Sequence, residues 1–154
     1  MKKIIFFSSS RADLAFIYKL FAIFEKKKKY KTKVILNDYS KIDYNFIKKN
    51  KVLKIKTTKI NTDKFNLIEH VGKLLKNYTK LLSKLKPDYL FIVGDRYEAF
   101  AMTFVCNFLN IKIIHIAGGD VSKGSYDDEM RTYISKSAYL HFPTNMKSKE
   151  NLTL

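Results

Sequence analysis

The acidic residues that stand out in this sequence form a group of four within ten positions, in a chain otherwise rich in lysine. The group consists of Asp120, Asp127, Asp128 and Glu129. Carboxylates gathered in a cleft can hold unequal pKa values, so that one acts as an acid and another as a base. The last three could instead simply favour the positive end of a following helix, with Arg131 on its outer side. These residues alone leave both interpretations open.

A second polar segment, Gly94-Asp95-Arg96-Tyr97-Glu98, comes directly after an apolar run and contains a further carboxylate. Glycine at 94 allows a tight turn and would place Asp95 at the tip of a strand, where a doubly wound sheet assembles its ligand site. The structural alternative makes Asp95 the cap of the next helix and pairs Arg96 with Glu98 on the surface. The segment therefore predicts either a catalytic carboxylate or an ordinary helix start.

Arginine is rare in the chain and occurs only in such polar segments. Of 30 basic residues, three are arginines and 30 − 3 = 27 are lysines; the arginines are Arg11, Arg96 and Arg131. A planar guanidinium can bind phosphate through two donors at once, whereas a lysine is a point charge. Arg11 follows Ser8-Ser9-Ser10, where small hydroxyl residues let an anion approach a helix start, although such a cap is more often structural. The turn has no G-x-G-x-x-G and no Walker lysine, which disfavours a nicotinamide or ATP site.

A glycine pair after His115 gives the chain its third polar segment. Gly118 and Gly119 predict a flexible loop whose backbone amides can meet a ligand. His115 is predicted either to contact a ligand or to orient this loop. The other two histidines, His70 and His141, fall in helix and strand patterns and are predicted to be structural.

Short apolar runs alternate with longer amphipathic segments, which is typical of strand and helix units around a parallel sheet buried on both faces. The predicted strands are 4–8, 33–36, 52–55, 89–93, 111–115 and 139–142. The predicted helices are 14–24, 65–85, 97–109 and 128–137, and Pro87 should stop the second of them. This order predicts an α/β fold with a doubly wound, Rossmann-like parallel sheet that binds ligands beyond the carboxyl ends of its strands.

Length and composition set the class of protein. The chain has 154 residues, 46% of them hydrophobic, which suits one domain with one core. We find no run near the roughly 20 apolar residues of a membrane span and no signal-peptide pattern, so we expect a cytoplasmic protein that does not bind membranes. The single cysteine, Cys106, lies in an apolar run without a metal-ligand partner nearby, so we expect a buried thiol and no metal site.

The net charge of +16 raises nucleic acid as an alternative partner, because a basic surface attracts phosphates. The lysines, however, gather in solvated runs such as 26–29, while the arginines follow predicted strand ends and most aromatic residues fit core patterns. A nucleic-acid-binding module is therefore disfavoured. A catalytically silent assembly domain is a third alternative.

Four motifs together resemble a known family. They are S-R-A-D at 10–13, G-D-R-Y-E at 94–98, H-I-A-G-G-D at 115–120, and D-D-E-M-R followed by I-S-K-S-A-Y-L-H-F at 127–142. In order and spacing they are similar to the amino-terminal domain of hydrolysing UDP-N-acetylglucosamine 2-epimerases, which feed sialic, legionaminic and related nonulosonic acid synthesis. The match is specific from Gly94 through Phe142 and looser before residue 60.

The resemblance implies a two-domain fold like that of GT-B glycosyltransferases, with a UDP-amino sugar between the domains, no cofactor and no metal. Residues 1–154 would form the amino-terminal domain, and the carboxyl-terminal nucleotide-binding domain would be absent. The isolated chain would then be an inactive fragment, and the complete enzyme would be a homo-oligomer.

The resemblance also implies roles at matching positions. Asp95 and Asp127 match acid–base carboxylates, and Asp128 lies in the same acidic helix start. The positions implied to lie against the substrate are Arg11, Arg96, His115, Gly118, Gly119 and Arg131. Many relatives have an ionisable residue, often Glu, where this chain has Ala117, and Asp120 is the nearest candidate to replace it. The glycine- and histidine-containing loop of relatives is also replaced, by residues 36–40. Either change could alter the sugar accepted.

Overall fold

The computed structural model describes residues 1–37, 51–55, 64–121 and 126–153. The side chains at positions 11, 64, 65 and 126 lie outside this description. Much of the lysine-rich stretch at 39–64, and most of the replaced loop at 36–40, therefore fall outside the described residues.

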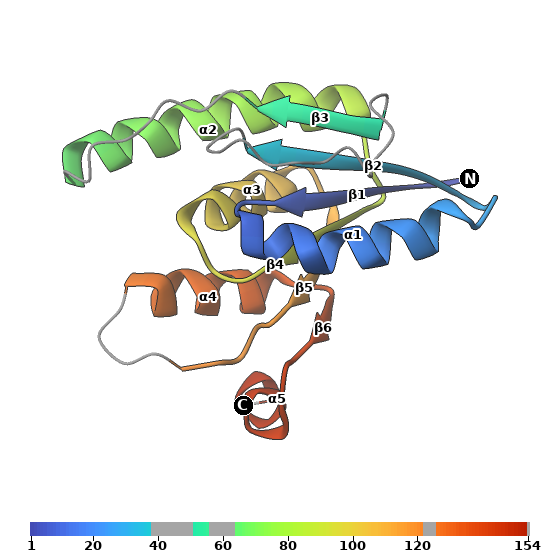
Figure 1. Cartoon of the computed structure of the whole chain (residues 1–154). Helices are drawn as coiled ribbons and strands as arrows, with labels where there is room; N and C mark the ends of the chain where they lie inside the picture. The colour runs from blue at the N-terminus through green and yellow to red at the C-terminus, as the bar shows by residue number, and fades with distance from the viewer. Residues whose placement is uncertain (38–50, 56–63, 122–125, 154) are drawn as a thin grey trace.

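Strands and helices alternate in the predicted order, with one addition at the end (Figure 1). The strands are β1 (Lys2–Ser8), β2 (Tyr30–Asn37), β3 (Val52–Ile55), β4 (Tyr89–Val93), β5 (Lys112–Ile116) and β6 (Leu140–Phe142). The helices are α1 (Arg11–Glu25), α2 (Lys64–Leu85), α3 (Tyr97–Phe108), α4 (Tyr126–Ser137) and α5 (Met146–Thr153). Helix α5 was not predicted, and β2 begins three residues before its predicted start.

The six strands form one sheet in the order β3-β2-β1-β4-β5-β6, and every pairing is parallel. This confirms the predicted doubly wound α/β fold. The chain builds outward from β1 to β3, then returns to the other side of β1 and builds outward again through β6. The reversal lies between β1 and β4, and in sheets of this kind ligands bind beyond the carboxyl ends of the strands at that point.

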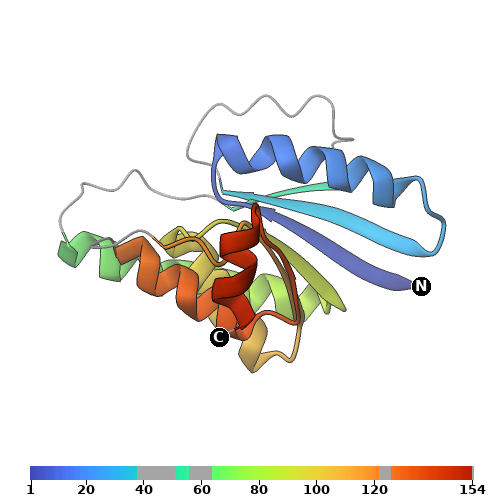
Figure 2. The ribbon, with the colours of Figure 1, turned by 90° about the horizontal axis from the view of Figure 1, so that it is seen from below.

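Helices cover both faces of the sheet. Successive side chains of β1 point to opposite faces, and both sets are apolar and buried. Ile4 and Phe6 pack on the side of α1, whereas Ile5 and Phe7 pack on the side of α2, α3 and α4. Figure 2 shows α1 on one side of the strands and the other three helices on the opposite side. Because the strands are buried from both sides, they consist of nearly continuous apolar residues.

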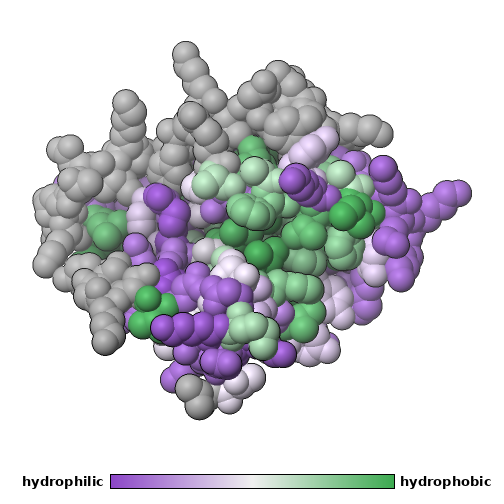
Figure 3. Space-filling view, turned by 60° about the horizontal axis from the view of Figure 1, so that its bottom comes forward, coloured by the Kyte–Doolittle hydropathy of each residue, from purple (hydrophilic) through white to green (hydrophobic). Residues whose placement is uncertain are grey.

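The edge of the sheet at β6 is less covered than its centre. Leu140 and Phe142 are exposed, while the apolar residues of β1 are buried. Figure 3 shows apolar side chains gathered in the middle of the face presented by α1, β6 and α5, with hydrophilic side chains around them. Among the described residues, no helix is both long and apolar enough to cross a membrane.

Candidate functional site

Arg131 is the centre of a polar cluster beyond the end of β4. Its side chain is 11% exposed and donates from Nη2 to the carboxylate of Asp95. From Nη1 it donates to Oδ1 of Asp128 at 3.3 Å and to the backbone oxygen of Asp120 at 2.6 Å. One side chain on α4 therefore holds three of the predicted site residues, which are up to 36 positions away in sequence.

Two structural alternatives from the sequence are wrong here. Arg131 does not lie on the outside of its helix, because it points into this cluster. Asp95 is not the cap of α3, because Arg96 has the extended backbone of the N-cap position, with φ −61° and ψ 155°. The carboxylate of Asp95 is thereby free of a capping role and is oriented by Arg131 instead.

A pocket of about 180 Å³ lies beside the cluster, between α4 and α5. Its lining includes Asp128 and Arg131 from α4, and Asn151 from α5. Asp127 is exposed in the first turn of α4, next to Asp128. Residues 122–125, between the glycine pair and α4, lie outside the described residues. Of the acidic residues at the start of α4, Asp128 thus lines a hollow that a small ligand could enter.

His115 is buried beneath the cluster and connects β4 to α4. Its Nε2 lies 2.8 Å from the backbone oxygen of Gly94, and since that oxygen can only accept, Nε2 carries the proton. Its Nδ1 therefore accepts from the hydroxyl of Ser135, at 3.3 Å. Burial lowers the pKa of His115 from 6.5 to about 4, so the ring is neutral at pH 7. Of the two predicted roles for His115, this geometry fits the orienting one; ligand contact stays a prediction.

The glycine pair was predicted to form a flexible loop, but both glycines pack closely against neighbouring residues. A Cβ at position 118 would lie 2.6 Å from Nδ1 of His115, and a Cβ at Gly119 would overlap the backbone oxygen of Ser148. Gly119 also has a φ of +85°, and Ala117 has a φ of +61°, which is uncommon for a residue with a side chain. These glycines are therefore required by close packing against a histidine and against α5.

The side chain of Asp120 contacts the start of α5 and the turn before it. Its Oδ1 accepts from the hydroxyl of the buried Ser148 and, at 3.4 Å, from Thr144. Asn151 donates to the backbone oxygen of the adjacent Gly119 at 2.8 Å. The structure therefore gives the carboxylate of Asp120 a role in holding α5, and its predicted acid–base role stays a prediction.

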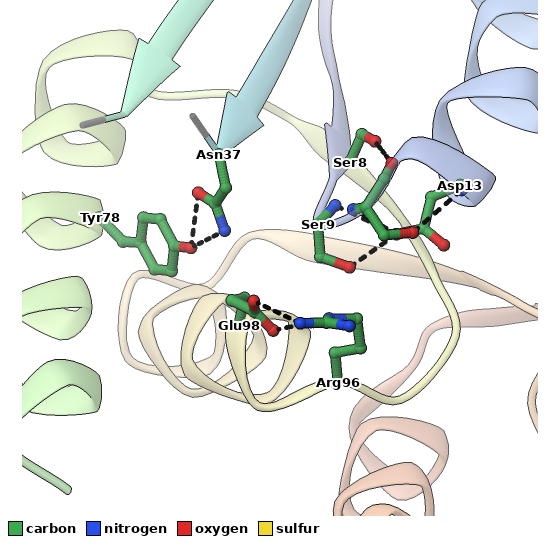
Figure 4. A network of polar contacts seen from close by, with 8 residues as sticks. Ser8, Ser9, Asp13, Asn37, Tyr78, Arg96 and Glu98 are labelled. Carbon is green, nitrogen blue, oxygen red and sulfur yellow. Dashed lines mark hydrogen bonds and ion pairs between the residues drawn. The ribbon is translucent and has the colours of Figure 1, made fainter. Parts of the chain in front are cut away.

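The serine-rich segment at 8–13 forms a capping box at the start of α1. Oδ2 of Asp13 accepts from the backbone N–H and the hydroxyl of Ser9, and from the backbone N–H of Ser10 (Figure 4). Ser10 in turn caps the backbone N–H of Asp13 at 3.2 Å. The structural interpretation of these serines is thus satisfied, and the side chain of Arg11 lies outside the described residues.

Sequence reasoning missed two contributors to the site. Ser135 orients His115 and lies four residues after Arg131, so helical spacing places both on one face of α4. The structural alternative paired Glu98 with Arg96 on the surface; the pair forms at 3.1 Å, but the side chain of Glu98 is completely buried. A carboxylate one residue into an otherwise apolar helix is the signal that could have identified it.

The buried His115 predicts a loss of stability in acid. The unfolded chain takes up this proton near pH 6.5 and the folded chain only near pH 4, so the stability is present above about pH 6.5 and falls as the pH approaches 4. Its contribution to the slope approaches about 1.4 kcal/mol per pH unit. Urea unfolding at about pH 7.5 and about pH 5, in the parent and in His115→Gln, measures it.

The comparison isolates His115 because other titrating groups act equally in both proteins. Asp88 and Glu69, whose pKa values are lowered by partners on the surface, contribute the same slope to parent and variant. His70→Gln is the matched control, because burial also lowers the pKa of His70, which lies on α2, and its loss should leave the contribution of His115 to the slope in place. An equal slope in the parent and in His115→Gln would contradict the assignment.

The sequence profile of a family described as UDP-N-acetylglucosamine 2-epimerase matches residues 25–154. The chain belongs to the UDP-N-acetylglucosamine 2-epimerase family. The match spans the end of α1 through α5 and so includes all the residues of the Arg131 cluster.

Two similar relatives within this epimerase family are curated proteins. The GDP/UDP-N,N'-diacetylbacillosamine 2-epimerase (hydrolyzing) of Campylobacter jejuni is 37% identical over 75 residues, which are 49% of this chain and 20% of the relative. The UDP-N,N'-diacetylbacillosamine 2-epimerase (hydrolyzing) of Legionella pneumophila is 32% identical over 87 residues, which are 56% of this chain and 23% of the relative. The matched segments thus span about a fifth of the length of these relatives.

A solved structure in the same epimerase family shares the fold over nearly the whole chain. The UDP-GlcNAc 2-epimerase of Neisseria meningitidis, bound to UDP-GlcNAc, matches with a TM-score of 0.84 at 21% identity. The superposition covers 99% of this chain and 43% of the Neisseria chain. The described fold is therefore that of a part of such an epimerase, spanning less than half of its length.

Proposed function

We propose that this chain is the part of a hydrolysing UDP-amino-sugar 2-epimerase that carries the acid–base carboxylates. The observation that supports this most directly is the carboxylate of Asp95, held by Arg131 beyond the carboxyl end of β4. That position adjoins the strand reversal where doubly wound sheets bind their ligands. A carboxylate fixed there by an ion pair is in place to exchange a proton with a bound sugar.

The reaction that we propose has two steps. In the first, a carboxylate removes the proton from C2 of the sugar as the bond from C1 to the UDP oxygen breaks, so that UDP leaves and a C1=C2 double bond forms. In the second, water adds its oxygen to C1 and gives up a proton to a carboxylate, while an acid returns a proton to C2 from the opposite face. The products are UDP and the free 2-epimeric amino sugar. Asp95 and Asp127 are proposed for the two proton transfers, and Asp128 supports them within the same cluster.

Arg96 and Arg131 are proposed to face the anionic and polar parts of the substrate. Arg96 is half-exposed at the start of α3, so a ligand beyond the carboxyl end of β4 could reach its guanidinium. We propose UDP-N-acetylglucosamine or a related UDP-amino sugar, including the diacetylated sugar in the names of the two curated relatives. A place in nonulosonic acid synthesis follows for a free 2-epimeric amino sugar, because such sugars are building blocks of these acids.

Release of UDP tests the proposal. Because this chain spans less than half of the solved epimerase, residues 1–154 are joined to the carboxyl-terminal part of the Campylobacter relative, and both UDP-N-acetylglucosamine and UDP-N,N'-diacetylbacillosamine are offered. We expect turnover on the order of 1 s⁻¹ with one of them, and no release above background from residues 1–154 alone, since one domain leaves the cleft open to water. A folded chimera that releases no UDP from either sugar would overturn the proposed function.

A further inference from the structure

Glu98 is a buried carboxylate that the proposed reaction does not use. Its side chain is 0% exposed, in the first turn of α3. Most of its neighbours in that helix are apolar or small, among them the buried Ala99 and Met102. Burial of an ionised carboxylate is costly unless it is paired, so its presence at this position calls for a reason.

The guanidinium of Arg96 lies side-on against this carboxylate. Nε donates to Oε2 at 3.1 Å and Nη2 donates to Oε1 at 3.2 Å, as Figure 4 shows. These two bonds use one edge of the guanidinium, so its other edge, with Nη1, is directed away from Glu98. The side chain of Arg96 is 49% exposed. Glu98 therefore fixes an arginine that remains half-exposed, with its guanidinium 5.7 Å from the ring centroid of Tyr97.

The ion pair between Arg96 and Glu98 contributes little to the stability of the fold. The half-exposed Arg96 keeps much of its hydration, so its attraction repays the burial of Glu98 only in part. The positive end of α3 also favours a carboxylate at this position, but an exposed residue in the first turn would obtain the same benefit. What the burial adds is rigidity, because Glu98 cannot turn away and Arg96 keeps one orientation.

Arg96 lies where a doubly wound sheet binds its ligands, so a fixed orientation of its side chain could serve binding. It stands at the end of β4, while Ser9 and the start of α1 follow the neighbouring strand β1, so both lie at the reversal of the strand order (Figure 4). We propose that Glu98 is a positioning residue that holds Arg96 ready to bind an anionic group of the ligand, of the diphosphate class. This inference rests on the proposed function, since it supplies the sugar nucleotide whose diphosphate Arg96 would meet.

The direction in which anion affinity changes when Glu98 is replaced distinguishes a positioning role from a purely electrostatic one. Removing a negative charge beside an anion site should strengthen anion binding if charge alone matters. If Glu98 positions Arg96, its replacement by the isosteric glutamine should weaken binding, because a mobile guanidinium must be ordered again. Inorganic pyrophosphate is a suitable probe, since its binding needs neither the sugar nor turnover.

The experiment follows the Nε–H signals of the three arginines by NMR in residues 1–154, each assigned through an Arg→Lys variant. In the parent we expect pyrophosphate to shift the Arg96 signal. In Glu98→Gln we expect that signal to move toward the value of a free arginine and the pyrophosphate affinity to fall about tenfold or more. Glu69→Gln is the matched control, because Glu69 is an exposed partner of Lys73 on α2, and its loss should leave the affinity unchanged or slightly higher.

The inference is overturned if pyrophosphate leaves the Arg96 signal of the parent unmoved, or if Glu98→Gln binds as tightly as the parent or more tightly. It is also overturned if Glu98→Gln merely unfolds more easily while its folded fraction keeps the parent affinity, which would indicate a structural carboxylate. A different result would overturn the proposed function alone: the folded chimera would release no UDP, although Arg96 would still bind pyrophosphate.

Discussion

Replacing Asp95 by asparagine is expected to lower the rate of UDP release by the chimera about 10² to 10⁴-fold, which is the usual effect of removing a positioned acid or base. Asparagine keeps the size of the side chain and can still accept a hydrogen bond from Arg131, so the fold should survive. The loss should fall on kcat and on kcat/KM alike, because the proton transfer belongs to the transition state. Steady-state kinetics with coupled detection of UDP measures it. Asp127→Asn is expected to behave in the same way.

The matched control for this prediction lies at the other end of the same strand. Asp88 immediately precedes β4, where it accepts from Lys2 and from the backbone N–H of Lys3. Asp88→Asn should cost some stability through these lost contacts and leave the rate unchanged. If Asp95→Asn and Asp127→Asn both keep more than roughly a third of the parent rate, neither is a catalytic carboxylate.

Alanine at Gly119 is expected to destabilise the chain by about 2 to 5 kcal/mol. Its Cβ would overlap the backbone oxygen of Ser148, which cannot move unless α5 shifts, and overpacking of this kind costs about 1 to 3 kcal/mol. The φ of +85° adds about 1 to 2 kcal/mol for a residue with a side chain. Urea unfolding of the parent and the variant at one pH measures the difference.

Two other glycines separate the contributions to this loss. Gly94 has a φ of +73° but open space around its Cβ position, so Gly94→Ala should show the backbone strain alone. Gly72 lies in α2 with open space and an ordinary backbone, so Gly72→Ala should stabilise the chain by up to about 1 kcal/mol. If Gly119→Ala costs no more than Gly94→Ala, the contact with α5 is not as close as described.

The fold could be predicted from the sequence because its signals are local and repeated. Apolar runs such as 89–93, each followed by a helical period, are sufficient to indicate a parallel sheet buried on both faces. The helix α5 escaped prediction because its eight residues are mostly polar and it is held largely by Ser148 and Asn151, through bonds to a loop that precedes it by about 30 positions. No sequence period reports such a contact.

The sequence singled out several residues that the structure brings together, but not the contacts that join them. Asp95, Asp120 and Arg131 were singled out by type and by their places after strands, and the structure brings them together. The sequence could not show that Arg131 bridges them, because a residue in the second turn of a helix is equally compatible with solvent. The burial of Glu98 could not be predicted either. An ion pair between residues i and i+2 has the same sequence pattern whether it is exposed to water or buried.

The central position of β1 has a consequence for how the chain is made. One edge of β1 pairs with β2, which follows soon after, but the other edge pairs with β4, whose Tyr89 lies opposite Ile4. At a synthesis rate of about 5 to 20 residues per second, that second edge waits several seconds or longer for its partner. During this interval Ile4–Phe7 keep one unpaired apolar edge, preceded by Lys2 and Lys3, whose charges oppose pairing with other chains. The nascent chain is therefore most prone to aggregation before residue 93 has been added, and rapid overproduction should increase its need for chaperones.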